Sequence, residues 1–230
     1  MGEVTMSANN QSAQGGDNHI NLYEPHVWKH HTKVAGLEWK NPVGTASGTF
    51  QYAAVRWFYD VSQLGAVCTK GASPVPWEGN PSPRTAESPA ANINAVGLQN
   101  PGIDHYLAED LPKLKAAGAF VISNVAGHCD DDYAAVVEKL ADSDADMLEI
   151  NVSCPNVSAG GMSVGTDPVA LANLMDRLRP MTDKPMIVKL TPNVTDITVP
   201  ARAAVEHGAD ALSMINTLKG MRINIRTGKP

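Results

Sequence analysis

The sequence predicts an α/β fold in which short parallel strands alternate with helices around one hydrophobic core. From residue 40 onward, apolar or β-branched runs alternate with amphipathic stretches of helical length. Gly65, Gly118 and Gly208 each lie between a helical stretch and the next apolar run. Because glycine tolerates positive φ, these positions indicate helix ends followed by strands. With 43% hydrophobic and 18% charged residues, the 230-residue chain can bury a sizeable core.

The alternation predicts about six βα units. The predicted strands cover residues 42–46, 66–69, 120–124, 147–151, 186–190 and 211–216. The predicted helices cover residues 53–64, 104–117, 131–141, 168–179 and 196–207, and several begin at Ser, Thr or Asp. A closed parallel (β/α)₈ TIM barrel needs eight units and typically about 250 residues. We therefore expect an incomplete barrel over residues 31–230, although a complete open, doubly wound sheet of about six strands fits the periodicity too.

The composition of the chain limits the kinds of binding partner and the cellular compartment that we expect for it. The net charge of −6 and the pI of about 5.6 give no indication of a surface that binds nucleic acid or an anionic membrane. Residues 1–30 are expected to form a flexible extension, because the segment is polar and lacks an apolar signal core or membrane span. The three cysteines, Cys68, Cys129 and Cys154, form no CxxC pair or metal-ligand set, so we expect no metal site and a reducing cytoplasm.

Polar side chains gather where the predicted strands end. In both candidate architectures ligands bind at the carboxyl ends of parallel strands. Each of these residues alone could be a cap or turn residue, but together they favour a binding site. Lys70 and Lys189 end apolar runs, which indicates an anionic ligand. The set is Ser47, Gly48, Thr69, Lys70, Asn124, Asn151, Ser153, Cys154, Lys189, Asn216 and Thr217. The sequence contains no GxGxxG or Walker A motif, so standard dinucleotide or nucleoside triphosphate binding has no support.

Cys154 differs in context from the other two cysteines. A lone cysteine is usually an inert small hydrophobic residue. Cys154 follows a strand end, precedes a proline and lies in a glycine-containing stretch, which suits a proton-transferring group on a closing loop. Cys68 and Cys129 lack this setting and are expected to be structural.

Six segments carry a resemblance to a known family. They are NPVGTASG (41–48), GNPSPR (79–84), NAVGLQNPG (94–102), NVSCPNV (151–157), KLTPNVTDI (189–197) and INT (215–217). In this order and spacing they resemble the dihydroorotate dehydrogenases, from about residue 34 to the end of the chain. A cysteine at position 154, the GLQNPG and TPNVTD runs, and the lack of an apolar amino-terminal segment resemble the catalytic subunits of class 1B.

The resemblance implies a reaction and a cofactor. It implies oxidation of (S)-dihydroorotate to orotate in pyrimidine synthesis, with Cys154 removing the C5 proton and FMN taking hydride from C6. It also implies a homodimer, and electron transfer to NAD⁺ through a partner subunit that carries FAD and a [2Fe–2S] cluster. The implied substrate-binding residues are Lys70, Asn94, Gly97, Leu98, Asn151, Asn156, Asn216 and Thr217. The implied FMN-binding residues are Ala46, Ser47, Lys70, Asn124, Asn151, Lys189 and Ile215, with Lys189 stabilising negative charge on the reduced flavin.

Three further expectations follow. The loops after the seventh and eighth strands, which hold a flavin phosphate in such barrels, lie beyond the predicted units, so weak FMN binding and little turnover are expected if nothing supplies them. A related pyrimidine-reducing flavin barrel of the dihydropyrimidine dehydrogenase type stays an alternative, although Lys70 with Asn94 favours a carboxylated substrate. A non-catalytic fragment that binds a partner through an unclosed face is a third possibility.

Overall fold

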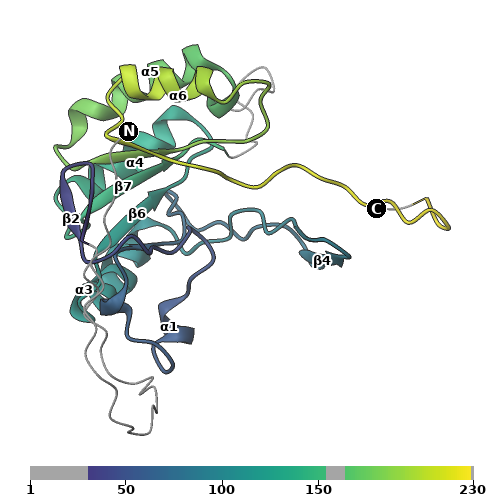
Figure 1. The fold of residues 1–230 in the computed structure, drawn as a ribbon, viewed down its shortest axis with the longest axis horizontal. Coiled ribbons are helices and arrows are strands. Elements are labelled where there is room, and N and C mark those ends of the chain that lie inside the picture. The colour runs from purple at the N-terminus through teal and green to yellow at the C-terminus, as the bar shows by residue number, and fades with distance from the viewer. Residues whose placement is uncertain (1–30, 154–163, 229–230) are drawn as a thin grey trace, which may run out of the picture.

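The computed structural model describes residues 31–153 and 164–228, and its centre is a five-stranded parallel sheet (Figure 1). The strands are β3 (Val67–Cys68), β6 (Val121–Val125), β7 (Met147–Asn151), β8 (Met186–Lys189) and β9 (Ala211–Ser213), in that spatial order. A doubly wound sheet reverses its strand order at a switch point. Within the described ranges the order follows the chain without reversal, so the doubly wound alternative is wrong and the topology is that of part of a β/α barrel.

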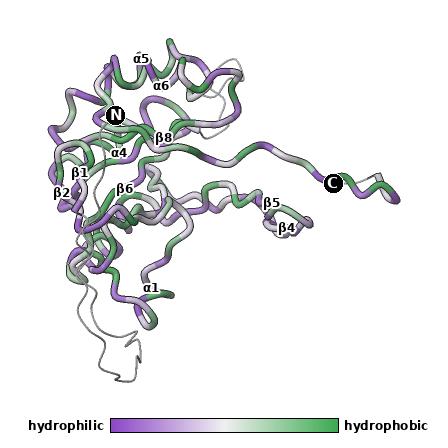
Figure 2. The backbone as a smooth tube through the Cα atoms, viewed as in Figure 1, coloured by the Kyte–Doolittle hydropathy of each residue, from purple (hydrophilic) through white to green (hydrophobic). Residues whose placement is uncertain are grey.

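Within residues 31–153 and 164–228, six α-helices lie between or beside these strands. They are α1 (Tyr52–Val55), α2 (Ile103–His105), α3 (Leu111–Ala116), α4 (Asp130–Ala141), α5 (Pro168–Leu178) and α6 (Thr198–Glu206). A π-helical segment, η2 (Tyr106–Asp110), joins α2 to α3, and short 3₁₀ turns are η1 (Val61–Gln63), η3 (Val164–Thr166) and η4 (Arg179–Met181). Asp167 begins α5 by accepting a hydrogen bond from the backbone N–H of Val169. Apolar and polar residues alternate along α5 and α6, as the bands in Figure 2 show.

The sheet has two differently covered faces. On its outer face, Leu148, Ile150 and Val188 pack in one apolar cluster with helix residues such as Leu171 and Leu174. On its inner face, a second cluster contains Ala66, Cys68, Ile122, Met147 and Ile187. An antiparallel hairpin of β1 (Thr32–Val34) and β2 (Leu37–Trp39) supplies Val34, Leu37 and Trp39 to this inner cluster. The hairpin therefore covers the inner face near the amino ends of the strands.

Two predicted elements are wrong in extent near the start of the sheet. Within the predicted strand 42–46, only Gly44 forms a β-bridge, with Ala66. The predicted helix 53–64 is broken, because α1 ends at Val55 and the next helical turn is η1. The side chain of Asp60 accepts from the backbone N–H of Ser62 and so begins a separate turn. Further along, the predicted strand 211–216 ends at Ser213.

The sequence patterns missed two hairpins. One is β1–β2, and the other pairs β4 (Thr85–Ser88) with β5 (Ala91–Asn94) in antiparallel register. The β4–β5 hairpin projects from the body of the molecule (Figure 1). Its two strands contain only two β-branched residues, Thr85 and Ile93, and no aromatic residue, so the pattern that marks strands is weak there.

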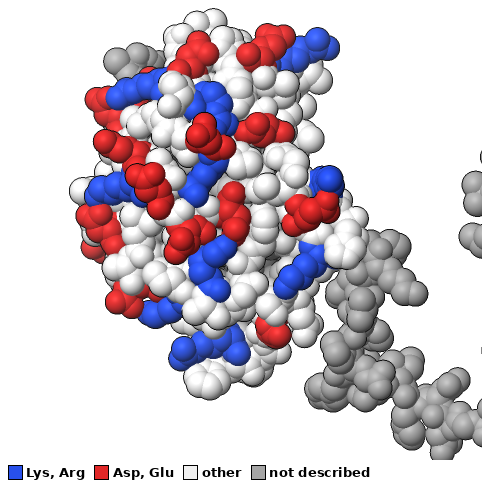
Figure 3. Space-filling model, turned by 90° about the vertical axis from the view of Figure 1, so that its left-hand side faces the viewer, with Lys and Arg blue, Asp and Glu red and all other residues white. Residues whose placement is uncertain are grey.

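The surface of the described residues carries charges of both signs. On the face shown in Figure 3, acidic and basic side chains are interspersed rather than gathered by sign. Within residues 31–153 and 164–228, no helix is long and apolar enough to cross a membrane. The expected extension over residues 1–30 lies outside the described residues.

Candidate active site

The inner face of the sheet changes from apolar to polar toward the carboxyl ends of its strands. Because side chains alternate along a strand, Ile122 and Asn124 share the inner face, as do Met147, Glu149 and Asn151. Toward the carboxyl ends, Cys68 of the apolar cluster adjoins Asn124, Glu149 and Lys189, and these four residues are called the inner polar layer. All four residues are buried. An enclosed set of amide, carboxylate, thiol and ammonium groups needs internal partners or a ligand.

Glu149 is the acceptor within this layer. Asn124 Nδ2 donates to Glu149 Oε1 at 2.6 Å, and Cys68 Sγ donates to the same oxygen at 3.3 Å. Burial, and then the charge of Glu149, raise the pKa of the Cys68 thiol well above its ordinary value, although Lys189 acts in the opposite direction. Cys68 therefore stays a neutral thiol. The other amide atom, Asn124 Oδ1, is buried without a hydrogen-bond partner among the described residues.

Hydrogen bonds join the loops that follow β7 and β9. Ser153 Oγ donates to Asn151 Oδ1 at 2.7 Å, and Asn216 Nδ2 donates to the same oxygen at 3.1 Å and also to Ser153 Oγ. Tyr133 on α4 donates its hydroxyl to the backbone carbonyl of Asn151 at 2.8 Å. Asn151 pairs in register with Lys189 on β8. Together with Lys70, the residues Asn151, Ser153, Lys189 and Asn216 are called the strand-end cluster below.

Two ammonium groups of the strand-end cluster repel each other. Burial, and then the charge of Lys189, lower the pKa of Lys70. Among the described residues, neither Lys70 nor Lys189 has a carboxylate oxygen within 4.0 Å of its ammonium nitrogen. A half-buried and a buried cation without such partners favour an anionic ligand.

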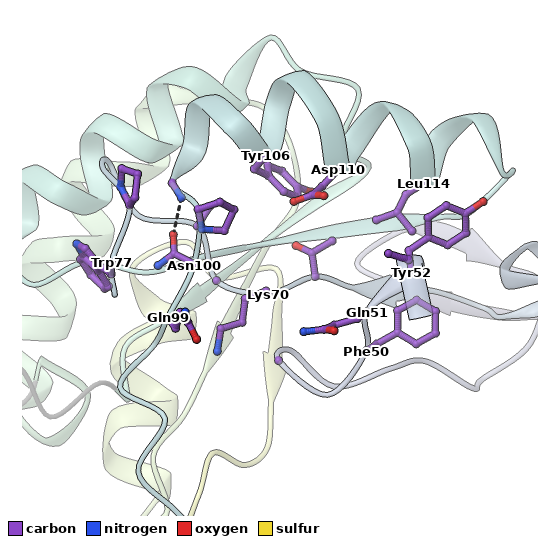
Figure 4. A pocket seen from close by; sticks show the side chains of 18 of the residues that line it. Phe50, Gln51, Tyr52, Lys70, Trp77, Gln99, Asn100, Tyr106, Asp110 and Leu114 are labelled. Atoms are coloured by element: carbon purple, nitrogen blue, oxygen red, sulfur yellow. Dashed lines mark hydrogen bonds between the residues drawn. The ribbon is translucent and has the colours of Figure 1, made fainter. Parts of the chain in front are cut away.

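A cavity of about 840 Å³ opens beside the strand-end cluster (Figure 4). Lys70 lies at its border, and aromatic side chains of Phe50, Tyr52 and Trp77 line it. It extends over the outer side of β3 to Tyr106, whose burial raises the pKa of its hydroxyl to about 12. Asn124, Asn151, Lys189 and Asn216 do not line this cavity. Lys70 is thus the residue that the cavity and the strand-end cluster share.

Comparison with protein families identifies the chain. The family model described as dihydroorotate dehydrogenase matches residues 29–230. The chain belongs to the dihydroorotate dehydrogenase family. Among its curated relatives, the "Dihydroorotate dehydrogenase B (NAD(+)), catalytic subunit" of Alkaliphilus metalliredigens is 52% identical over 86% of this chain and 66% of the relative.

Other relatives carry two different names. The protein named "Dihydroorotate dehydrogenase B (NAD(+)), catalytic subunit" from Lachnoclostridium phytofermentans is 51% identical over 84% of this chain and 64% of its own length. A protein of Aquifex aeolicus named "Putative dihydroorotate dehydrogenase A (fumarate)" is 49% identical over 86% of this chain and 65% of its own length. The chain therefore spans just under two thirds of the length of these dihydroorotate dehydrogenases.

The structure brings together some of the residues that the resemblance implied. Lys70, Asn151, Lys189 and Asn216 meet in the strand-end cluster, and Asn124 lies in the inner polar layer. Ser47, next to Ala46, lies close enough to Cys68 for its backbone to lower the pKa of the Cys68 thiol. Ile215 and Thr217 flank Asn216 and are exposed. Cys154 and Asn156 lie outside the described residues, but Cys154 directly follows Ser153 in the sequence.

Three residues expected at a dihydroorotate dehydrogenase site lie on a different element. Asn94 ends β5, and Gly97 and Leu98 follow it with positive φ. Arg84 holds this segment by donating to the side chain of Gln99 and to the carbonyls of Asn80 and Glu78. No hydrogen bond among the described residues joins Asn94, Gly97 or Leu98 to the strand-end cluster, but Val96 and Gln99, which flank Gly97 and Leu98, line the cavity together with Lys70.

Sequence reasoning missed two polar residues near the site. Glu149 lies two positions before Asn151 in an apolar strand, so strand alternation could have placed both on one face. Asn193, in the loop after β8, donates to the carbonyl of Thr217 and accepts from the backbone N–H of Lys219. No local signal in the sequence predicts that contact. Within the described part of the chain, no group of three or more His, Cys, Asp or Glu side chains is arranged to hold a metal ion.

Proposed function

We propose that this chain oxidises (S)-dihydroorotate to orotate in pyrimidine synthesis, with FMN as its cofactor. The observation that carries the proposal is the strand-end cluster, where Lys70 and Lys189 lie beside the amides of Asn151 and Asn216. Dihydroorotate combines a carboxylate with a ring of amide groups. Ammonium groups suit the carboxylate, and primary amides suit the ring because they both donate and accept hydrogen bonds. The names of the relatives agree with this substrate.

The chain's own residues would divide the binding and the proton transfer. Lys70 would bind the substrate carboxylate, with Asn94, Gly97, Leu98, Asn156 and Thr217 as further substrate contacts. Asn151 and Asn216 would orient the pyrimidine ring. Cys154 would remove the proton from C5, a role that requires its thiol to ionise near the lysines. FMN, when bound, supplies the acceptor for the hydride that leaves C6.

The inner polar layer fits a flavin ring. Asn124 Oδ1 is a buried acceptor that needs an N–H donor, and an isoalloxazine carries one. Lys189 would stabilise the negative charge that the ring gains on reduction. Ala46, Ser47, Lys70, Asn151 and Ile215 are proposed as further FMN contacts. We also propose that residues 31–230 belong to one (β/α)₈ barrel domain of TIM type.

The first experiment compares reductants of the bound flavin under anaerobic conditions. Supplied with FMN, the chain should bleach the flavin absorbance with dihydroorotate and not with dihydrouracil, because only dihydroorotate carries the carboxylate. Cys154→Ala should keep the flavin spectrum and slow reduction about 10²- to 10⁴-fold, the usual contribution of a general base. Faster reduction by dihydrouracil would instead support the dihydropyrimidine dehydrogenase type of reaction. No bound flavin and no reduction would favour the non-catalytic alternative.

The electron acceptor is a separate proposal. We propose class 1B, in which a homodimer of the catalytic chain works with an FAD and [2Fe–2S] subunit that passes electrons to NAD⁺. The words "B (NAD(+)), catalytic subunit" in several relatives' names support it, whereas one relative is named for fumarate. Mixing the reduced chain with fumarate tests the choice: class 1B predicts that the flavin stays reduced, and rapid reoxidation would contradict it. The predicted cytoplasmic location stays a prediction.

A further inference from the structure

Glu149 is a buried carboxylate without a role in the proposed reaction. It lies in the middle of β7 on the inner face and is only 5% exposed. Enclosing a carboxylate is unfavourable unless donors compensate it. Its Oε1 accepts from Asn124 Nδ2 at 2.6 Å and from Cys68 Sγ at 3.3 Å. The first of these is a short, charge-assisted hydrogen bond, so Asn124 is strongly coupled to Glu149.

Glu149 determines which end of the Asn124 amide faces away from it. An ionised carboxylate can only accept hydrogen bonds, so the amide must present its Nδ2 to Glu149 and turn its Oδ1 elsewhere. That oxygen is buried and has no partner among the described residues. A Cβ at Gly71 would lie 2.6 Å from it, so glycine leaves the space beside the oxygen open. The arrangement preserves a hydrogen-bond acceptor for an N–H group of a ligand.

Glu149 also changes the electrostatic potential of the inner polar layer. It pairs in register with Ile187, so Lys189 lies diagonally across from it on β8 and on the same face. Both charges act on the sulfur of Cys68, in opposite directions. A ligand in the same layer would therefore experience the positive charge of Lys189 partly offset by Glu149.

We propose that Glu149 is a positioning residue for the flavin: it holds the Asn124 amide with its oxygen free, and its charge lowers the reduction potential that Lys189 raises. This inference rests on the proposed FMN site. It adds a residue to that site which acts through Asn124 and through its own charge.

The central test is the reduction potential of FMN bound to the Glu149→Gln variant. This substitution keeps the shape of the side chain but removes a negative charge, so the reduced flavin, which carries more negative charge, becomes easier to form. We expect at least a tenfold rise in the ratio of reduced to oxidised flavin at a fixed potential, which is about 30 mV for a two-electron couple. A dye-coupled anaerobic titration measures it. The matched control is Glu138→Gln, which removes the same charge at an exposed position on α4 and should leave the potential unchanged.

A second variant separates the effect of Glu149 on the position of the Asn124 amide from the effect of its charge on the flavin. Glu149→Asp keeps the charge but withdraws the carboxylate from Asn124, so the potential should stay near that of the wild type while the dissociation constant of FMN rises several-fold. This variant also serves if Glu149→Gln does not fold. The inference would be overturned if Glu149→Gln left the reduction potential unchanged, or if Glu149→Asp left the affinity for FMN unchanged. Either result would leave the proposed function intact. Failure of the wild type itself to bind FMN would overturn both.

Discussion

Lys70 shows how the environment of a single residue bears on function. Its ammonium is half-buried, and burial followed by the charge of Lys189 lowers its pKa. Since the folded-state pKa lies below the unfolded value, the unfolded chain binds more protons between these two values. The contribution of Lys70 to stability therefore increases as pH rises through that interval. A bound carboxylate would reverse the effect, because it favours the charged form.

Amine labelling measures this difference. The rate at which acetic anhydride modifies Lys70 should rise with pH at a lower inflection than for Lys33, whose pKa is raised by its hydrogen bond to Glu38 and by the charge of Glu38. Saturating orotate should move the Lys70 inflection upward and leave Lys33 unchanged. Mass spectrometry of the labelled peptides gives both rates. Coincident inflections for the two lysines would count against a perturbed Lys70.

At the scale of elements, sequence reasoning succeeded where the periodicity was strong. The predicted strand 147–151 coincides with β7, and the predicted helices 131–141 and 168–179 lie within one residue of α4 and α5 at each end. It failed where a side-chain cap or backbone pairing, rather than an apolar pattern, decides the structure. Between α1 and η1, Asp60 begins a new turn, and the hairpins β1–β2 and β4–β5 are fixed by backbone pairing rather than by an apolar pattern.

The loop between β8 and α6 controls the segment after β9. Asn193 donates to the carbonyl of Thr217 at 3.1 Å and accepts from the backbone N–H of Lys219 at 2.8 Å. Asn193→Ala removes both bonds, each worth about 1 kcal/mol, so the segment that holds Asn216 should loosen. We expect KM for dihydroorotate to rise about tenfold with bound flavin retained, measured by initial rates. Asn224→Ala, which removes only local turn contacts, is the control, and equal effects of the two substitutions would refute this role.

Helix α5 tests the outer core. Leu174 is fully buried, so Leu174→Ala should lower the free energy of unfolding by about 2–5 kcal/mol. Val169 lies on the same helix but is 66% exposed, so Val169→Ala should change it by less than about 0.5 kcal/mol. Urea unfolding followed by circular dichroism compares the two. Similar losses in both variants would mean that α5 does not pack as described.

At the scale of the whole molecule, the strand-end rule predicted which polar residues the fold would bring together in the strand-end cluster. Lys70, Asn151, Lys189 and Asn216 end strands or follow them, and parallel strands bring those ends together. The rule did not find Glu149, because it concerns loops and strand ends, whereas Glu149 lies inside a strand. Its role depends on the inner face being enclosed, which only the assembled sheet and the β1–β2 hairpin establish.

Large apolar side chains lie exposed on two segments of the molecule. Trp57 and Phe58 follow α1 with 75% and 90% exposure, and Ile225, in the segment after β9, is 96% exposed. Such groups favour association, so we expect the sedimentation coefficient to increase with protein concentration. Phe58→Ser should weaken that increase, whereas Val169→Ser, at an isolated exposed position, should not. A sedimentation coefficient that stays at the value of a monomer at all protein concentrations would contradict the prediction.

The β1–β2 hairpin makes the two ends of the inner face different, because it covers only the end at the amino termini of the strands. Because the hairpin packs against the amino ends, the substrate and the product of the proposed reaction would both have to pass the carboxyl ends of the strands. Orotate that has not yet left would then keep the next dihydroorotate out. We therefore expect orotate to behave as a competitive inhibitor, which initial rates at several orotate concentrations would measure.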